Sequence, residues 1–200
     1  MRMGVMGMAV LLGARMLVAA EPVVVTDQTT NAAVALVNQA GVDAALLARV
    51  AKQMEADLNV GVCVFSLEAC DNGLTAMRRS RATPRPVFCR VVFWKGDGGD
   101  FRESLQLSPD AKVALVDVSA LLGDAPDGDR LAGRLQRQAV RGVGLLLGMS
   151  YVRGPPCILQ RAATVGQLDK LSRNFSPPAS GEFMLKIQLE GVNFLSGYGE

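Results

Sequence analysis

Residues 134–159 of this chain read RLQRQAVRGVGLLLGMSYVRGPPCIL. A helix over about 129–147 is predicted because apolar residues recur there at helical spacing. The positions expected to be buried are Leu131, Leu135, Val143 and Leu146. Gly148 follows the last of them and marks a turn. We call this predicted helix and its glycine turn the frame, and the rest of the chain is interpreted relative to it.

The spacing of this frame is that of a zinc-binding helix. In the motif H-E-x-x-H, two histidines one turn apart bind the ion and the glutamate between them is the general base. A glycine turn then brings a third ligand onto the metal. The chain, however, contains no histidine at all. The frame therefore has the spacing of a metal-binding helix without its usual ligands.

Aligned position by position, the segment resembles a degenerate archaemetzincin, a metzincin-type family with the pattern H-E-x-x-H-x-x-G-x-x-H-C-x4-C-x-M-x17-C-x-x-C. Arg141 stands at the first histidine position and Gly142 at the position of the base. Leu145 and Tyr151 stand at the second and third histidine positions, whereas the turn residue Gly148 is retained. The resemblance implies a zincin-like fold whose positions for metal binding and catalysis have changed.

The resemblance continues beyond the turn. Val152 replaces the first cysteine of the pattern, Cys157 retains the second, and Leu159 stands at the Met-turn position. The last C-x-x-C pair falls on Pro177 and Ser180. The resemblance therefore implies that three of the four structural zinc thiolates are missing as well.

The predicted fold class is α/β (α+β), a zincin-like small mixed sheet covered by helices. Strands are expected at 59–67, 87–94 and 111–118, which are rich in Val, Phe and Cys or Leu. Near-continuous apolar runs in these strands imply burial on both faces of the sheet. Residues 42–57 carry apolar side chains at helical spacing and are expected to form a helix across the sheet. Residues 112–119 also resemble the family's strand before the active-site helix.

Several shorter segments have local signals. Residues 23–25 suit a strand and 29–31 a helix cap. The sequence GDGGD at 96–100 has the chemistry of a tight hairpin turn. A helix is expected at 165–175, closed by two prolines. The alternating apolar residues of 183–190 favour a strand, although the family resemblance implies a helix there.

Residues 1–20 have the pattern of a secretory signal peptide, which leaves a single metzincin-like domain over 21–200. The alternatives are an N-terminal membrane anchor or a buried helix. With cleavage, the protein is expected to be secreted or periplasmic, without stable insertion in a membrane. Loss of Arg2 and Arg15 leaves 19 basic and 19 acidic residues. A formal net charge of zero gives no global preference for nucleic acid.

The four cysteines are an even number in a chain expected to be exported, which favours one or two disulfides. The candidates are Cys63, Cys70, Cys89 and Cys157. Three full pairings remain open. Cys63, inside an apolar run, could alternatively be a small buried hydrophobe. A zinc site is not expected because no C-x-x-C pair or histidine accompanies these thiols.

Two charged clusters each allow two interpretations. The basic stretch 77–86 is expected to be extended, and it is either an anion-binding patch or a solvated loop. The acidic cluster of Asp124, Asp127 and Asp129 suggests a calcium loop but lacks the further acidic ligand of an EF-hand. The other interpretation is a loop in which Asp127 or Asp129 caps the following helix.

The predicted function is that of a secreted, non-catalytic archaemetzincin-like pseudopeptidase that binds a peptide or a protein, with no cofactor. No catalytic residue or metal ligand is assigned, since Arg141, Gly142, Leu145 and Tyr151 supply at most one weak oxygen ligand. One alternative is a structural, envelope-associated domain whose cleft is closed by Leu145 and Tyr151. Another is a hydrolase with a relocated site, such as a cysteine nucleophile or a Ser-Lys pair. An open groove beside Arg141 favours binding, and a filled one favours a scaffold.

Overall fold

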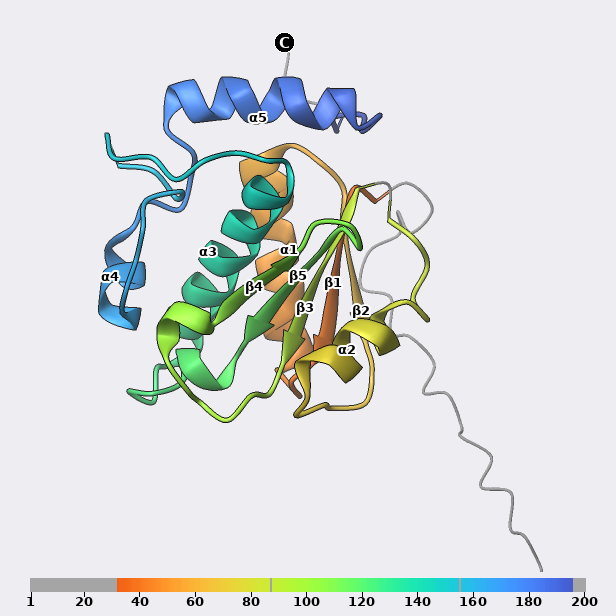
Figure 1. The fold of residues 1–200 in the computed structure, drawn as a ribbon, viewed down its shortest axis with the longest axis vertical. Coiled ribbons are helices and arrows are strands. Elements are labelled where there is room, and N and C mark those ends of the chain that lie inside the picture. The colour runs from red at the N-terminus through yellow and green to blue at the C-terminus, as the bar shows by residue number, and fades with distance from the viewer. Residues whose placement is uncertain (1–31, 87, 155, 196–200) are drawn as a thin grey trace, which may run out of the picture.

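A computed structural model describes residues 32–86, 88–154 and 156–195. Its centre is a five-stranded sheet with the strand order β2-β1-β3-β5-β4 (Figure 1). The first four strands in this order are parallel, and β4 runs antiparallel to β5 at the edge. The strands are β1 (Val34–Gln39), β2 (Val62–Ser66), β3 (Cys89–Trp94), β4 (Leu105–Ser108) and β5 (Val113–Asp117). The predicted mixed sheet is confirmed.

Helices cover both faces of the sheet. The helices are α1 (Ala44–Leu58), α2 (Gly73–Ser80), α3 (Gly128–Leu146), α4 (Val165–Lys170) and α5 (Pro177–Leu189). Two short 3-10 turns are also present: η1 (Phe101–Glu103) precedes the edge strand β4, and η2 (Ser119–Leu121) follows β5. Helices α1 and α3 pack side by side on one face, and α2 lies on the other (Figure 1). The helices predicted over 42–57 and 129–147 are confirmed.

The larger part of the core lies between the sheet and the pair α1 and α3. Its fully buried members include Leu36, Val91, Leu47, Met54, Leu135 and Val143. Every residue of the interior strand β1 is buried, because helices cover the sheet on both sides. Neither β1 nor the edge strand β4 was predicted. Residues 32–37 are a short apolar run, and periodicity alone does not distinguish such a run from a buried helical segment.

The tight hairpin predicted at 96–100 is wrong, because β5 lies between β3 and β4 in the sheet. The segment instead leads into η1 and then into the edge strand. The carboxylate of Asp117 accepts hydrogen bonds from the backbone N–H of Gly96 (3.0 Å) and of Ser119 (2.8 Å). A Cβ at Gly96 would lie 2.1 Å from Asp117 Oδ2. Glycine is therefore required there by close approach to the carboxylate rather than by a hairpin.

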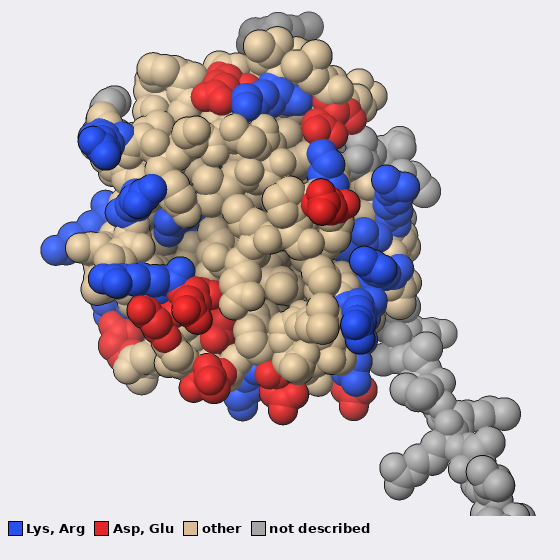
Figure 2. All heavy atoms as spheres, in the orientation of Figure 1, with Lys and Arg blue, Asp and Glu red and all other residues tan. Residues whose placement is uncertain are grey.

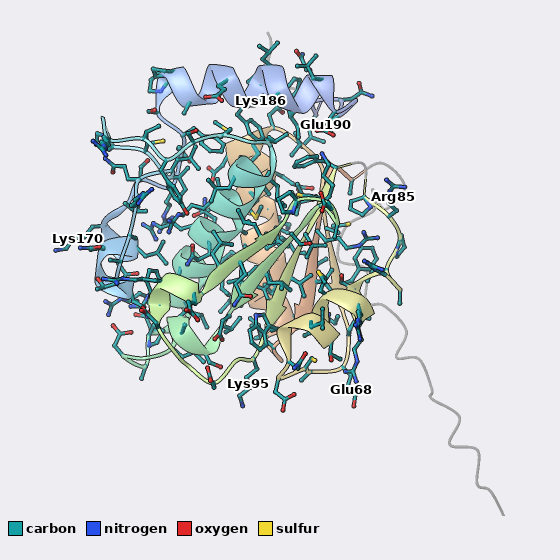
Figure 3. The ribbon with its side chains drawn as sticks, viewed as in Figure 1. Glu68, Arg85, Lys95, Lys170, Lys186 and Glu190 are labelled. Carbon is teal, nitrogen blue, oxygen red and sulfur yellow. The ribbon has the colours of Figure 1, made fainter. Side chains whose placement is uncertain are left out.

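The strand favoured for 183–190 is also wrong, since these residues belong mainly to α5. The buried residues Ala179, Phe183 and Ile187 are spaced four apart, as one helix face requires, whereas Leu189 is 80% exposed. The prolines that were expected to close the preceding helix instead begin α5. Lys186 Nζ donates to the carbonyl oxygens of Leu147 (3.3 Å) and Gly148 (3.1 Å), which ties α5 to the end of α3. Figure 3 shows Lys186 and Glu190 along α5.

Some predictions concern residues outside the described part of the chain. These are the signal peptide at 1–20, the strand at 23–25 and the cap at 29–31. The helix expected at 165–175 is shorter than predicted and ends at Lys170. Among the residues that the structure describes, no helix is both long and apolar enough to cross a bilayer.

Candidate functional site

Helix α3 and the turn after it form the frame that the sequence predicts. The Asp127 carboxylate accepts a hydrogen bond from the Arg130 backbone N–H (2.8 Å), so the predicted N-cap is confirmed. At the other end, Gly148 has a left-handed backbone with φ of 73°, which glycine adopts without strain. The chain then folds back on itself, and the N–H of Val152 donates to the carbonyl of Leu159 (3.2 Å). Residues after the turn are thereby brought beside α3.

The four residues that the sequence resemblance aligns with metal and base positions have different environments. Arg141 is buried, with 5% of its surface exposed, and its guanidinium carbon lies 5.7 Å from the centroid of the Tyr151 ring. Gly142 faces the sheet so closely that a Cβ there would lie 2.8 Å from the Cβ of Ala114. Leu145 packs against the main core. Only Arg141 and Tyr151 are therefore brought together at one site.

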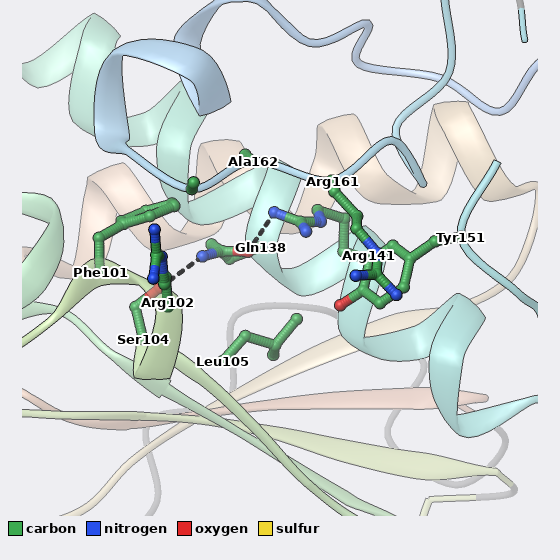
Figure 4. A pocket seen from close by; sticks show the side chains of 10 residues that line it. Phe101, Arg102, Ser104, Leu105, Gln138, Arg141, Tyr151, Arg161 and Ala162 are labelled. Atoms are coloured by element: carbon green, nitrogen blue, oxygen red, sulfur yellow. Dashed lines mark hydrogen bonds between the residues drawn. The ribbon is translucent and has the colours of Figure 1, made fainter. Parts of the chain in front are cut away.

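A cavity of about 540 Å³ lies beside these two residues, between α3, the start of β4 and the loop after α3 (Figure 4). Its polar lining consists of Arg102, Ser104, Gln138, Arg141, Tyr151 and Arg161. Its apolar walls are Phe101, Leu105, Ala162 and Ala163. We call this cavity the arginine pocket. Its lining residues include three arginines and no acidic side chain, so it is strongly electropositive.

The arginine pocket is open to solvent, because Arg102, Tyr151 and Arg161 at its rim are exposed. Leu145 does not line it, and Tyr151 forms part of a wall rather than filling it. The closure by Leu145 and Tyr151 that the scaffold alternative required is therefore not observed. A second cavity of about 690 Å³ shares Tyr151 and Arg161 with the pocket and continues past Arg153 and Lys170. Basic side chains gather on this side of the molecule, at the left of the view in Figure 2.

The charge of Arg141 is only weakly compensated. Burial lowers the pKa of Arg141, and the neighbouring Tyr151 raises it in part. Its Nη1 donates to Gln138 Oε1 (3.2 Å), while its Nε is shielded from solvent and has no acceptor among the described residues. Gln138 in turn donates from Nε2 to Ser104 Oγ (2.8 Å). Figure 4 shows Gln138 linking Ser104 at one end of the pocket to Arg141 near the other.

Solved structures provide a comparison for this arrangement. The archaemetzincin of Methanopyrus kandleri superposes with a TM-score of 0.57 at 13% identity, over 80% of this chain and 98% of that one. A zinc-dependent peptidase of Methanocorpusculum labreanum (strain Z) gives 0.60 at 15% identity, over 77% and 99%. The archaemetzincin of Archaeoglobus fulgidus, in complex with malonate, gives 0.53 at 18% identity, over 74% and 99%. The fold is archaemetzincin-like. No protein-family model and no curated protein matches the sequence.

An archaemetzincin-like fold implies a zinc ion at the end of α3, and the residues present do not fit one. Arg141, a permanent cation, stands where the first ligand is expected and would repel a metal ion. Leu145 offers no donor atom. Tyr151 offers one oxygen, but two guanidinium groups lie within 5.7 Å of its ring centroid. Over the described residues, no group of three or more Cys, Asp or Glu side chains could hold a metal ion.

A second buried arginine on α3, Arg134, was not predicted from the sequence. Its side chain is fully buried and makes short hydrogen bonds to Asp124 (2.6 and 3.0 Å) and Asp169 (2.8 and 2.9 Å). It also donates to the carbonyl of Leu121 (2.6 Å). The hydrogen bonds from Arg134 hold the pKa values of both carboxyl groups below their usual range, and those carboxylates raise the pKa of Arg134. The one sequence signal was its place on the same helix face as Leu131.

The acidic cluster is divided among separate partners. Asp124 binds Arg134 and Arg130, Asp127 caps α3, and Asp129 pairs with Arg49 at 2.6 Å. These three aspartates therefore stabilise the start of α3. The loop interpretation is the one that the structure supports.

The predicted disulfides are not present, since all four cysteines are free and buried. Cys63 lies on β2 and Cys89 on β3, with β1 between them in the sheet. Two interstrand spacings amount to about 10 Å, beyond the ~7 Å that a disulfide spans between Cα atoms. Cys70 donates to the Asn72 carbonyl, and Cys157 Sγ accepts from the Ser176 N–H. Burial raises the pKa of Cys63 to about 11, which is unsuited to a thiolate nucleophile.

The basic stretch 77–86 is not extended throughout, because α2 includes its first residues and ends at Ser80. Arg79 makes a loose ion pair with Glu68 at 3.6 Å. Arg81 and Arg85 line a cavity together with Arg90, a group whose pKa is lowered by burial. An acidic residue, Asp110, also lines that cavity, in contrast to the arginine pocket.

Proposed function

We propose that this protein is a secreted, non-catalytic archaemetzincin-like module that binds peptides in the cleft between β4 and α3. The observation that carries the proposal is the open arginine pocket of about 540 Å³, which is lined by Arg141 and Tyr151, two of the four residues that align with the family's metal and base positions. Its size is in the range of specific ligand sites, and it combines apolar walls with a few convergent polar groups. Secretion is inferred from the leader-like sequence of residues 1–20.

The edge strand β4 supplies a template for an extended peptide. It borders the pocket through Leu105, and it pairs only with β5 among the described residues. The Asp117 N–H donates to the Ser104 carbonyl, so in the antiparallel register Gln106 and Ser108 also face β5. The backbone groups of Leu105 and Leu107 therefore point outward. An added peptide strand would form its main-chain hydrogen bonds with these two residues.

The side chains around this cleft are unsuited to peptide hydrolysis. Hydrolysis requires an activated water and a general base within hydrogen-bonding reach. Gly142 stands at the base position, and a larger side chain there meets Ala114. Neither Arg102, Arg141 nor Arg161 accepts a proton near neutral pH. The described residues that line the pocket therefore include groups that can hold a peptide but no carboxylate or imidazole that could serve as the general base.

The test uses the chain expressed without residues 1–20. A degenerate peptide pool is incubated with the protein, with and without added zinc, and both the retained and the free peptides are identified by mass spectrometry. Retention of intact peptides and absence of stoichiometric zinc after dialysis are the expected results. Cleaved peptides, or a stoichiometric zinc ion found by elemental analysis, would overturn the non-catalytic proposal.

Two variants of one residue separate strand addition from other modes of binding. Leu107→Pro removes an outward N–H donor while leaving the β5 side of the ladder in place. Leu107→Ala keeps that donor and serves as the matched control. We expect the proline variant to lose peptide binding and the alanine variant to retain it. Equal binding by two folded variants, as judged by circular dichroism, would exclude strand addition at β4.

A further inference from the structure

We infer that the arginine pocket is a carboxylate site, so that the preferred peptide places a carboxylate group against Arg141. This inference rests on the proposed peptide-binding function and adds the chemistry of the ligand. The carboxylate comes either from an Asp or Glu side chain or from the C-terminus of the peptide. Three arginines, Arg102, Arg141 and Arg161, line this one cavity.

Among the described residues, Arg141 is a buried cation that has no carboxylate partner. It is 5% exposed, its Nε has no acceptor, and none of the ion pairs formed within the described residues involves it. Burying an unpaired charge is unfavourable unless a partner is supplied. A bound anion would supply that partner. The neutral oxygen of Gln138 and the side chain of Tyr151 hold part of the guanidinium, and neither supplies a carboxylate.

Arg161 and Tyr151 extend the positive site. The guanidinium carbon of Arg161 lies 5.2 Å from the Tyr151 ring centroid, and that of Arg141 lies 5.7 Å from the same centroid. One aromatic ring therefore contacts two guanidinium groups. These like charges repel each other, and an anion that contacts both would remove this repulsion. Figure 4 shows Arg141, Arg161 and Tyr151 grouped at one end of the pocket.

Arg102 stands at the opposite end of the pocket and also has no carboxylate partner among the described residues. In the surrounding segment 149–176, four basic residues accompany the single acid Asp169. Asp169 is bound by Arg134 and Arg130 and is not available to the pocket. Among the described residues, no acidic side chain lines the pocket.

The planar guanidinium group matches a carboxylate better than it matches other peptide groups. It presents N–H donors in a fixed fork that two carboxylate oxygens can accept together. The pocket borders Leu105 on the edge strand, so a peptide paired with β4 can direct a side chain or its C-terminus into it. The apolar walls formed by Phe101 and Leu105 suit the methylene groups that carry such a carboxylate.

The experiment compares four peptides of one backbone sequence. One is amidated and neutral, the second is amidated with one Gln replaced by Glu, the third is neutral with a free C-terminus, and the fourth carries a phosphoserine. Dissociation constants are measured by fluorescence anisotropy at 50 and 200 mM salt. We expect the Glu peptide or the free-acid peptide to bind about tenfold or more tightly than the neutral one. Which of the two binds tighter identifies the source of the carboxylate.

Variants assign the effect to the pocket. Arg141→Met is expected to abolish the preference for a carboxylate while neutral peptides still bind, and Arg141→Lys to restore part of it. Arg85→Met removes one surface charge outside this pocket and is the control for net charge. Equal binding of all peptides would refute the carboxylate site and leave peptide binding intact. Absence of binding to any peptide would instead refute the proposed function, and tightest binding of the phosphopeptide would replace the carboxylate by a phosphate.

Discussion

Arg134 and Arg141 lie two turns apart on α3 and are both buried, but within the described part of the chain Arg134 is paired with two carboxylates and Arg141 with none. The first arrangement is complete within the protein, with Asp124, Asp169 and a carbonyl oxygen as acceptors. The second leaves a donor without an acceptor beside an open cavity. A residue that stabilises the fold and a residue available for a ligand thus occur on the same helix.

Replacement by methionine should lower the free energy of unfolding at Arg134 but not at Arg141. Arg134→Met leaves Asp169 without its main partner and is expected to lower the free energy of unfolding by about 3 kcal/mol. Arg141→Met removes an unpaired buried charge. It is expected to leave the free energy of unfolding unchanged or to raise it by about 1 kcal/mol. Urea unfolding of both variants measures the difference. A loss of stability in Arg141→Met as large as that in Arg134→Met would show that Arg141 is a structural residue.

The Arg134 network should make the fold sensitive to acid. Hydrogen bonds from Arg134 lower the pKa of Asp169 from its ordinary value of 3.8. A carboxyl group with a lowered folded-state pKa stabilises the protein fully above its ordinary value, and that contribution is lost as the pH falls through the folded value. Thermal unfolding of Asp169→Asn should therefore show a lower midpoint at pH 7 and a smaller further decrease between about pH 4 and 2 than the wild type. Parallel pH profiles for the two proteins would contradict this role of Asp169.

From the sequence, candidate-site residues that lie on one helix and its turn could be located. Residues that come together only in the folded protein could not. The frame from Arg141 to Tyr151 could be located because a helix and a glycine turn have fixed residue spacing. Arg102 and Arg161 could not be assigned to the same pocket, because they come from η1 and from the loop after α3. Their place in one pocket depends on how η1 and the loop after α3 pack together, which no local sequence pattern encodes. The disulfide prediction depended on the even count of cysteines, and it is wrong because all four thiols are free; the sheet order separates Cys63 from Cys89.

Gly142 is a position where helix propensity and packing predict opposite results. Propensity alone predicts that Gly142→Ala stabilises α3 by about 1 kcal/mol. The new Cβ would lie 2.8 Å from the Ala114 Cβ on β5, so we expect a net loss of about 1–2 kcal/mol instead. The double variant Gly142→Ala, Ala114→Gly should recover part of that loss. A double-mutant cycle with no coupling would show that α3 moves away from the sheet at little cost.

The four cysteines should behave as buried thiols rather than as disulfides. All are free, and burial raises the pKa of Cys63 to about 11. A thiol reagent at pH 8 should label nearly none of them in the native protein and all four after unfolding in denaturant, without added reductant. The melting temperature should be the same with and without reductant. Fewer than four labelled thiols in the unfolded, unreduced protein would reveal a disulfide.

The alternating apolar pattern of the C-terminal segment predicts a strand, but the segment forms the helix α5. Phe183, Leu185, Ile187 and Leu189 alternate as in a strand, but only Phe183 and Ile187 are buried, because the helical stripe of α5 uses every fourth residue. Ile187→Ala should lower the free energy of unfolding by about 2–4 kcal/mol. Leu189→Lys, at a site that is 80% exposed, should change it by less than about 0.5 kcal/mol. Similar losses in both variants would mean that Leu189 is also buried and that the segment is not the helix described.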